Sequence, residues 1–209
     1  ELADRSLEDR FREAVASGLR GIPRDELVGY LRDAADALDF MSEQHGLQHL
    51  DIKPENLLLQ GNHAKVGDFG LTKSLAAVGH SIVNGFTPLY APPELFDGRP
   101  DRGSDQYSLA IVYQMMLTGQ PPFNGRSAAQ LTSQHLKSPP DLTPLHPSDR
   151  AVVARALSKN PRTRFASCRQ FIDELARRRF ASPAGSRSSA AAEPVSGSSL
   201  TALVDSTAI

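Results

Sequence analysis

Cysteine is nearly absent from this chain of 209 residues, and Cys168 is the only one. A single cysteine excludes an internal disulfide framework and a zinc site of the C-x-x-C type. We interpret Cys168 as a partly buried small residue near the start of a helix. A lone thiol fits a reducing compartment. We therefore expect a cytoplasmic protein, and the sequence leaves open a membrane tether beyond its C-terminal residues.

Long apolar runs are also missing. No stretch approaches the roughly 20 apolar residues that cross a bilayer, so we expect no membrane segment in this chain. Residues 1–5 lead directly into charged sequence, unlike a signal peptide. Because the chain begins with Glu rather than Met, we expect a fragment or a processed piece. The net charge of -1 gives no general attraction to nucleic acid, so no nucleic-acid partner is expected.

An acid, a cation and an amide follow one another at fixed offsets in residues 49–56, which read H-L-D-I-K-P-E-N. Phosphoryl transfer needs a carboxylate to orient the attacking hydroxyl, a cation near the moving phosphate and an amide oxygen for a metal. Asp51, Lys53 and Asn56 supply these three groups. Taken alone, the stretch has an alternative interpretation as a polar turn between a helix and a strand.

A second motif, D-F-G, begins at Asp68 and follows two short apolar runs, 57–59 and 64–66. The runs predict a β-hairpin that turns at Gly61 and Asn62. Such a hairpin would carry Asn56 at one base and Asp68 at the other, so that both side chains could meet one Mg²⁺ site. At this distance after the first motif, D-F-G is rarely a chance match.

Together the two motifs resemble the protein kinase family, and specifically the C-terminal lobe of a eukaryotic-like serine/threonine kinase. The resemblance covers about residues 1–180 and implies a mainly α fold with a small β-hairpin sheet. The form T-P-L-Y-A-P-P-E with D-Q-Y-S resembles bacterial members. Residues 181–209 are rich in Ser, Ala, Gly and Pro, and we expect a disordered linker or tail there.

The resemblance implies roles for the polar residues of both motifs. Asp51 would orient the substrate hydroxyl and accept its proton late, and Lys53 would neutralise charge on the transferred phosphate. Asn56 and Asp68 would hold Mg²⁺, with Asp68 bridging the metal to the phosphates of ATP. This division suits a loose transition state, which needs positioning and charge more than covalent help.

The adenine would contact two other parts of the chain. Leu58 would lie under the ring, and backbone groups near Glu1 and Ala3 would bond its edge as a kinase hinge does. A frayed terminus before a helix is the alternative for the hinge residues. Asp4 and Ser6 could serve a nucleotide ribose or cap the following helix, and we favour the cap for Ser6.

Further family signatures lie downstream. Thr87 matches a Thr whose hydroxyl bridges the catalytic acid and Lys in serine/threonine kinases. Residues 92–94, P-P-E, resemble a variant of A-P-E, and the resemblance pairs Glu94 with Arg164. Asp105 matches an Asp that bonds the catalytic-loop backbone. Apolar periodicity and caps predict helices at 23–46, 104–119, 128–137, 149–157 and 167–179, with Ser104 as an N-cap.

Two departures from the family pattern change the expectations. Leu50 stands where the family has an Arg that meets a phosphate on the activation segment, so phosphorylation at Thr72, Ser74 or Ser81 is not expected to switch activity. No G-x-G-x-x-G motif precedes the hinge, and no strand Lys paired to a helix Glu is present. We expect the N-terminal lobe to be missing, and this chain alone to bind ATP weakly.

We therefore expect an ATP-dependent and Mg²⁺-dependent protein serine/threonine kinase, represented here by a truncated catalytic domain. Its partners would be ATP and a protein substrate. One alternative is a pseudokinase that acts as a binding module, although the four site residues Asp51, Lys53, Asn56 and Asp68 are all intact. Another is a small-molecule kinase of the aminoglycoside phosphotransferase type, which shares H-x-D-x-x-x-x-N but lacks the downstream signatures.

Overall fold

The computed structural model describes residues 3–69, 73–74 and 86–178. Its helices are α1 Leu7–Ala16, α2 Arg24–His45, α3 Pro93–Phe96, α4 Ser104–Thr118, α5 Ala128–Lys137, α6 Pro147–Ala156 and α7 Cys168–Arg178, with 3-10 helices η1 Pro54–Asn56 and η4 Pro161–Thr163. Its strands are β1 Arg5–Ser6, β2 Leu47–Gln48, β3 Leu57–Gln60, β4 His63–Val66 and β5 Lys73–Ser74. The expected mainly α fold with a small sheet is confirmed.

Some of the predictions fall on other parts of the chain. The predicted tail at 181–209, Glu1 of the hinge and the two hydroxyl residues Thr72 and Ser81 lie outside the described residues. In the described part of the chain, no helix combines the length and the hydrophobicity that crossing a bilayer requires.

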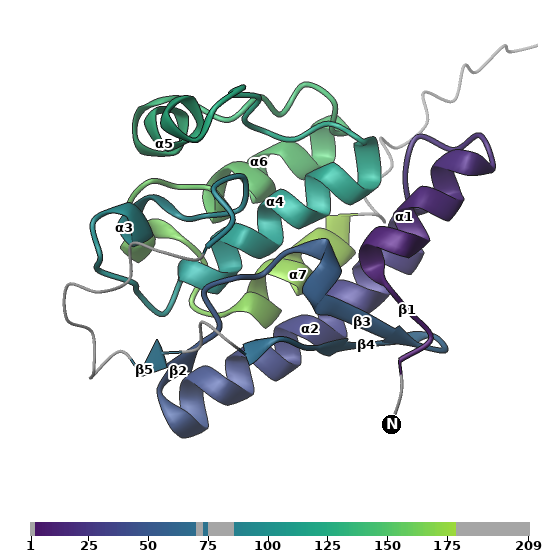
Figure 1. The fold of residues 1–209 in the computed structure, drawn as a ribbon, viewed down its shortest axis with the longest axis horizontal. Helices are drawn as coiled ribbons and strands as arrows, with labels where there is room; N and C mark the ends of the chain where they lie inside the picture. The colour runs from purple at the N-terminus through teal and green to yellow at the C-terminus, as the bar shows by residue number, and fades with distance from the viewer. Residues whose placement is uncertain (1–2, 70–72, 75–85, 179–209) are drawn as a thin grey trace, which may run out of the picture.

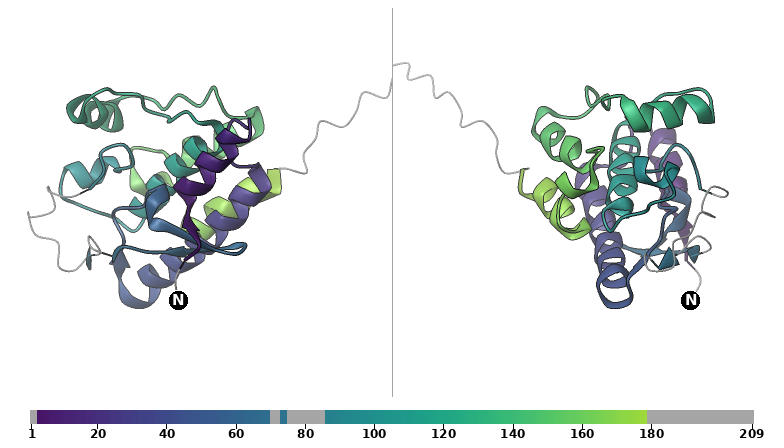
Figure 2. Two further views of the ribbon diagram at one scale, coloured as in Figure 1. Left: turned by 45° about the vertical axis from the view of Figure 1, so that its right-hand side comes forward. Right: turned by 90° about the vertical axis from the view of Figure 1, so that its left-hand side faces the viewer.

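The core forms where α2, α4 and α7 pack together, with the sheet along one side (Figure 1). Helix α4 is buried almost all round, as its apolar sequence predicts. Gly46 ends α2 and Gly119 ends α4, both in the left-handed conformation that glycine adopts without strain. Figure 2 shows α5 on the outside of this packing, above α4.

The two predicted N-caps have different outcomes. Ser6 caps α1 in a capping box with Asp9, which confirms the cap interpretation. Ser104 does not cap α4, because the N-cap position is occupied by Gly103 and no side-chain cap hydrogen bond is present there. The Ser104 hydroxyl instead donates to Glu94 Oε1 at 2.8 Å and accepts the Asp101 amide. That prediction was wrong because a contact from another element uses the hydroxyl.

The hairpin of β3 and β4 turns at Gly61 and Asn62 as predicted, with Gln60 opposite His63. The sheet has a third strand that the sequence did not predict, since β1 pairs antiparallel with β3 and places Ser6 opposite Leu58. A further two-stranded ladder joins β2 to β5 and places Leu47 opposite Ser74. Strands of two residues are too short to show a periodic pattern, so only the partner strand reveals them.

His135 is the one buried residue of α5. Its ring packs against the rings of Phe96, Phe123 and Tyr107, with the Phe123 centroid 4.5 Å away. Its Nδ1 lies 3.0 Å from the Tyr107 hydroxyl. Burial, with a smaller effect from the charge of Lys159, lowers the pKa of His135 to about 4. The ring is therefore neutral at physiological pH.

This pKa predicts a pH-dependent stability. As pH falls from about 6.5 to about 4, the unfolded chain binds a proton at this position and the folded chain does not. The unfolding free energy should fall by about 3 kcal/mol over this window because of His135. Urea denaturation at a series of pH values should show this loss for the wild type and a smaller one for His135→Phe. An identical pH dependence in both proteins would contradict the prediction.

Candidate active site

The predicted catalytic loop, residues 49–56, follows β2 and is held in place by hydrogen bonds to buried groups. The Asp105 carboxylate accepts the backbone amides of His49 and Leu50, both at 2.8 Å. This is the contact expected of Asp105. Burial raises the pKa of this carboxyl, while the two amide hydrogen bonds act in the opposite direction. His49, fully buried, lies with Nε2 at 2.9 Å from the Gly67 carbonyl oxygen and so ties the loop to the end of β4.

Leu50 adopts φ 66, in the left-handed region that costs a branched residue roughly 1 kcal/mol or more. The two bonds to Asp105 keep the loop in this conformation. Its side chain is buried in a small apolar cluster with Ala91 and Leu95, and Phe86 and Phe96 pack against it. From the sequence alone, Leu50 was notable only because it lacks the positive charge of an Arg at this position. The cluster was not predicted because its other members come from a distant segment.

The side chains of Asp51, Lys53 and Thr87 are in contact with one another. Lys53 Nζ donates to Asp51 Oδ2 at 2.7 Å, and the Thr87 hydroxyl donates to Asp51 Oδ1 at 3.3 Å. Lys53 Nζ also lies 3.4 Å from Thr87 Oγ1. Asp51 is only 9% exposed and Lys53 23%. The structure therefore contains the bridging contacts expected of Thr87, and they fix the orientation of the carboxylate.

Asn56 lies directly behind Asp51. Its side-chain Nδ2 donates to the Asp51 backbone oxygen at 2.9 Å and to Asp51 Oδ2 at 3.2 Å. The Gly67 amide donates to the Asn56 carbonyl oxygen at 2.8 Å, so the two bases of the hairpin are joined. Asp68 is the next residue and has φ 57. The hairpin thus brings Asn56 and Asp68 to neighbouring positions, as the sequence predicts.

These residues fit a magnesium ion held together with phosphates. Because Nδ2 of Asn56 is directed to Asp51, the amide oxygen is the atom left for a cation, and Asp68 offers carboxylate oxygens. Mg²⁺ prefers oxygen ligands and is usually bound by one or two carboxylates plus substrate phosphates. Among the described residues, no cluster of three or more His, Cys, Asp or Glu side chains could hold a metal without such a partner.

The predicted adenine contacts are only partly within the described residues. The Asp4 amide donates to the Leu59 carbonyl oxygen at 2.9 Å, which places Ala3, an exposed residue, beside the sheet that carries Leu58. The Asp4 carboxylate accepts the Gly61 amide at the hairpin turn. A Cβ on Gly67 would lie 2.8 Å from Leu58 Cδ1, so the Leu58 side chain covers this glycine. The roles of Ala3 and Leu58 toward adenine stay predictions.

Away from the reacting groups, Glu94 and Arg164 form the expected ion pair. Arg164 donates from Nη1 to Glu94 Oε1 at 2.7 Å and from Nη2 to Oε2 at 2.8 Å. The Arg164 side chain is fully buried, and it also donates to the carbonyl oxygens of Gly103 and Ser158. The pair therefore joins α3, the start of α4 and the segment before α7.

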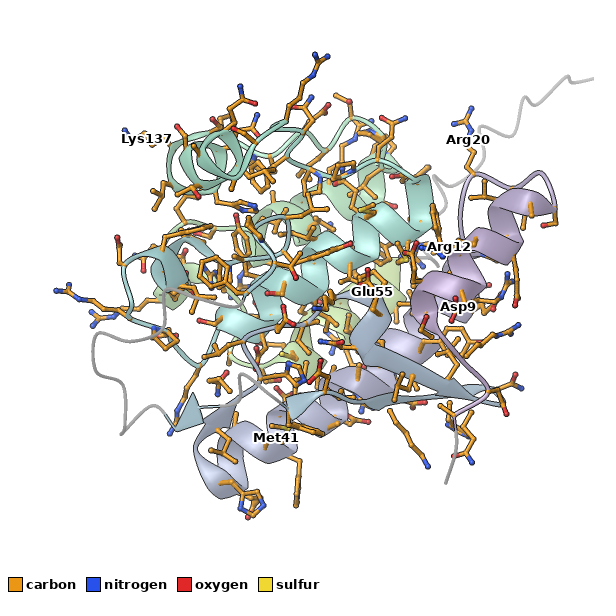
Figure 3. All side chains as sticks on the ribbon, viewed as in Figure 1. Asp9, Arg12, Arg20, Met41, Glu55 and Lys137 are labelled. Atoms are coloured by element: carbon orange, nitrogen blue, oxygen red, sulfur yellow. The ribbon has the colours of Figure 1, made fainter. Side chains whose placement is uncertain are left out.

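A separate cavity of about 840 Å³ lies between the end of α1, the end of α4 and the start of α6, and none of the predicted site residues lines it. Phe11, Val15, Leu19 and Leu117 supply apolar walls, and Arg20, labelled in Figure 3, lines it as well. No predicted function depends on this cavity.

The family model and the relatives that match this chain are protein kinases. The family model described as "Protein kinase domain" matches residues 3–184. The serine/threonine-protein kinase PknB of Mycolicibacterium smegmatis is 38% identical over 164 residues, which cover 72% of this chain and 26% of that protein. PknF of Mycobacterium tuberculosis is 34% identical over 177 residues, covering 76% of this chain and 36% of that protein. The chain thus spans about a quarter to a third of the length of these relatives.

Proposed function

Because this chain belongs to the eukaryotic-like serine/threonine protein kinase family, we propose that it is part of an ATP-dependent protein kinase. The reaction is transfer of a phosphoryl group from Mg-ATP to a Ser or Thr hydroxyl of a protein substrate. The observation that carries the proposal is the Asp51 carboxylate, held in one orientation by hydrogen bonds from Lys53 and Thr87.

Each residue then has a chemical task. Asp51 accepts a hydrogen bond from the substrate hydroxyl, orients its lone pair toward the phosphorus and takes its proton late. Lys53, bonded to Asp51, stabilises negative charge on the transferred group. Asn56 and Asp68 would hold Mg²⁺, which would neutralise charge on the phosphates. Leu58 and the backbone of Ala3 would contact the adenine, and the further contact predicted near Glu1 lies outside the described residues.

Thr87 orients Asp51 through its hydroxyl and would contact the approaching protein substrate. Asp105 supports the loop through two buried amides, and the pair of Glu94 and Arg164 supports the segment that follows Thr87. The protein acts in the cytoplasm, where ATP is available and where the lone thiol of Cys168, buried in α7, stays reduced.

The test is a kinase assay on the complete gene product with labelled ATP, protein substrates and aminoglycosides as competing acceptors. We expect label on Ser or Thr of protein. Label on aminoglycosides alone would favour the small-molecule kinase. Binding of a protein partner without any label transfer would favour a pseudokinase. Either of these two outcomes would overturn the proposal.

The burial of Leu50 predicts how the activity is regulated. A side chain in an apolar cluster offers no charge-assisted bond to a phosphate on the segment that holds Thr72, Ser74 and Ser81. We expect the triple alanine variant of these residues to keep nearly the full activity of the complete gene product. Initial rates against one peptide would measure this, with Asp51→Asn as the inactive control. Loss of most activity in the triple variant would contradict the prediction.

The residues of this chain supply one face of the nucleotide site. That face contains the residues proposed to bind the metal and the substrate. The chain has no Gly-rich loop and no strand Lys that would cover the phosphates. We therefore propose that the isolated 209-residue chain binds Mg-ATP with a dissociation constant far weaker than micromolar. Isothermal titration calorimetry on this chain would measure it. Micromolar affinity would show that the described face is sufficient.

A further inference from the structure

Thr87 orients the Asp51 carboxylate through contacts that are long for hydrogen bonds. The Thr87 hydroxyl lies 3.3 Å and the Thr87 amide nitrogen 3.4 Å from Asp51 Oδ1. Hydroxyl donors usually lie about 2.7–2.8 Å from an oxygen acceptor, so these contacts alone do not hold Thr87 in place. On its C-terminal side, the Thr87 carbonyl oxygen accepts the Tyr90 amide at 3.0 Å. The position of Thr87 therefore also depends on what holds the residue before it, Phe86.

The side chain of Phe86 packs on an apolar cluster. The buried members of this cluster are Leu50, Ala91 and Leu95. The Phe86 ring also meets the Phe96 ring nearly edge to face, with the two centroids 5.3 Å apart and an angle of 79° between the planes. Aromatic pairs favour this arrangement at this separation. Phe86 is thus anchored on one side, although it is only half-buried.

The surface on which Phe86 packs is itself held by buried contacts. Leu50 is 3% exposed, and its backbone amide donates to the buried Asp105 carboxylate at 2.8 Å. The other side of the cluster belongs to α3, which packs against α5 (Figure 1). The pair of Glu94 and Arg164 joins α3 to the segment before α7. The cluster is therefore a fixed surface, and the Phe86 ring takes its position from it.

The cluster lies next to the proposed reacting groups along both segments of the chain. Leu50 directly precedes Asp51, and Phe86 directly precedes Thr87. Because consecutive residues are about 3.8 Å apart, the apolar contact is one residue away from the contact between Thr87 and Asp51. An apolar contact needs no phosphate, and salt does not screen it as it screens exposed charges. The packing of Phe86 therefore sets the position of Thr87 in the unmodified chain.

We propose that Phe86 is a positioning residue of the active site. Its ring, packed on the cluster and on Phe96, fixes Thr87, and Thr87 then orients the Asp51 carboxylate toward the substrate hydroxyl. Leu50, which stands where the family pattern has an Arg, takes part in this contact through its apolar side chain. The inference rests on the proposed kinase function and adds a residue to it.

Substitutions at Phe86 test the inference in the complete gene product, by steady-state kinetics with one peptide. For Phe86→Ala we expect kcat to fall about 10–100-fold, because a misplacement of about 1 Å costs rates of this order. KM for Mg-ATP should stay within about twofold, since the change acts on the orientation of Asp51. Phe86→Leu keeps an apolar side chain on the cluster and should regain most of the lost rate. Phe40→Ala is the matched control, because Phe40 is 59% exposed on α2, and it should behave as wild type.

A double-mutant cycle with Thr87→Ala separates positioning from a general loss of structure. Because Phe86 acts through Thr87, Phe86→Ala should lower kcat by less than about threefold in the Thr87→Ala background. Thermal unfolding of each variant checks that it is folded. Phe96→Ala, which removes the ring that Phe86 meets, takes the place of Phe86→Ala in the cycle if that variant does not fold.

The outcomes for the inference and for the proposed function are distinct. With an active wild type, a kcat for Phe86→Ala within about twofold of wild type would overturn the inference. An equal fall in kcat with and without Thr87→Ala would overturn it as well, because Phe86 would then act on the fold and not on Thr87. A wild type that phosphorylates no peptide would overturn the proposed function, and the inference with it.

Discussion

Asp51→Asn in the complete gene product is expected to lower the rate of phosphoryl transfer to protein by about 10²–10⁴-fold. The amide has the same size as the carboxylate and can still bond Lys53. It cannot accept the proton of the substrate hydroxyl, and it removes the negative charge that Lys53 and the Thr87 hydroxyl orient. The loss should therefore appear in kcat for protein substrates, and the affinity for Mg-ATP should change little.

The measurement is a steady-state kinase assay with labelled ATP, beside binding of a fluorescent ATP analogue and thermal unfolding of each variant. Asp97→Asn is the matched control, because Asp97 lies exposed at the C-terminal cap of α3. Its rate should equal that of wild type. If Asp51→Asn kept more than about a tenth of the wild-type rate, a catalytic acid at this position would be wrong.

Arg164→Met should cost the folded chain about 3–5 kcal/mol, because it leaves the Glu94 carboxylate largely buried and without its cation. The substitution also leaves the carbonyl oxygens of Gly103 and Ser158 without their donor. It further removes a guanidinium 4.9 Å from the Tyr107 ring centroid. For a domain of this size the loss is a large share of the total stability.

Urea denaturation of the 209-residue chain would measure this loss. Arg162→Met is the control, since Arg162 is exposed in the same turn, η4, and should lose less than about 1 kcal/mol. The double variant Arg164→Met with Glu94→Gln should be more stable than the sum of the two single losses predicts, because no charge is left buried. Strictly additive losses would show that the two side chains are not coupled.

Much of the candidate site could be predicted because its groups are close together in the sequence. Asp51, Lys53 and Asn56 lie within six positions, and Asp68 follows one hairpin later. The turn at Gly61 and Asn62 needed only local backbone preferences. The caps at Ser6, Gly46 and Gly119 were likewise readable from local patterns, because capping depends on neighbouring backbone groups.

Other features depended on contacts between distant segments. Ser104 has the chemistry of an N-cap, but its hydroxyl bonds Glu94, and that choice depends on where α3 lies. The strand β1 exists only because residues 5–6 meet β3. No local pattern in the sequence singled out His135, and its burial against the rings of Phe96, Phe123 and Tyr107 follows from the packing of α5.

The sequence by itself determined the family, the mainly α fold and the candidate groups that we propose for phosphoryl transfer, because motifs and periodicity are local properties of the chain. Only the tertiary structure decided how those groups are held. It places Leu50 in an apolar cluster, directs the Ser104 hydroxyl to Glu94 and buries His135 among aromatic rings. The physical reason is that burial and hydrogen-bond partners depend on segments that meet only after the chain has folded.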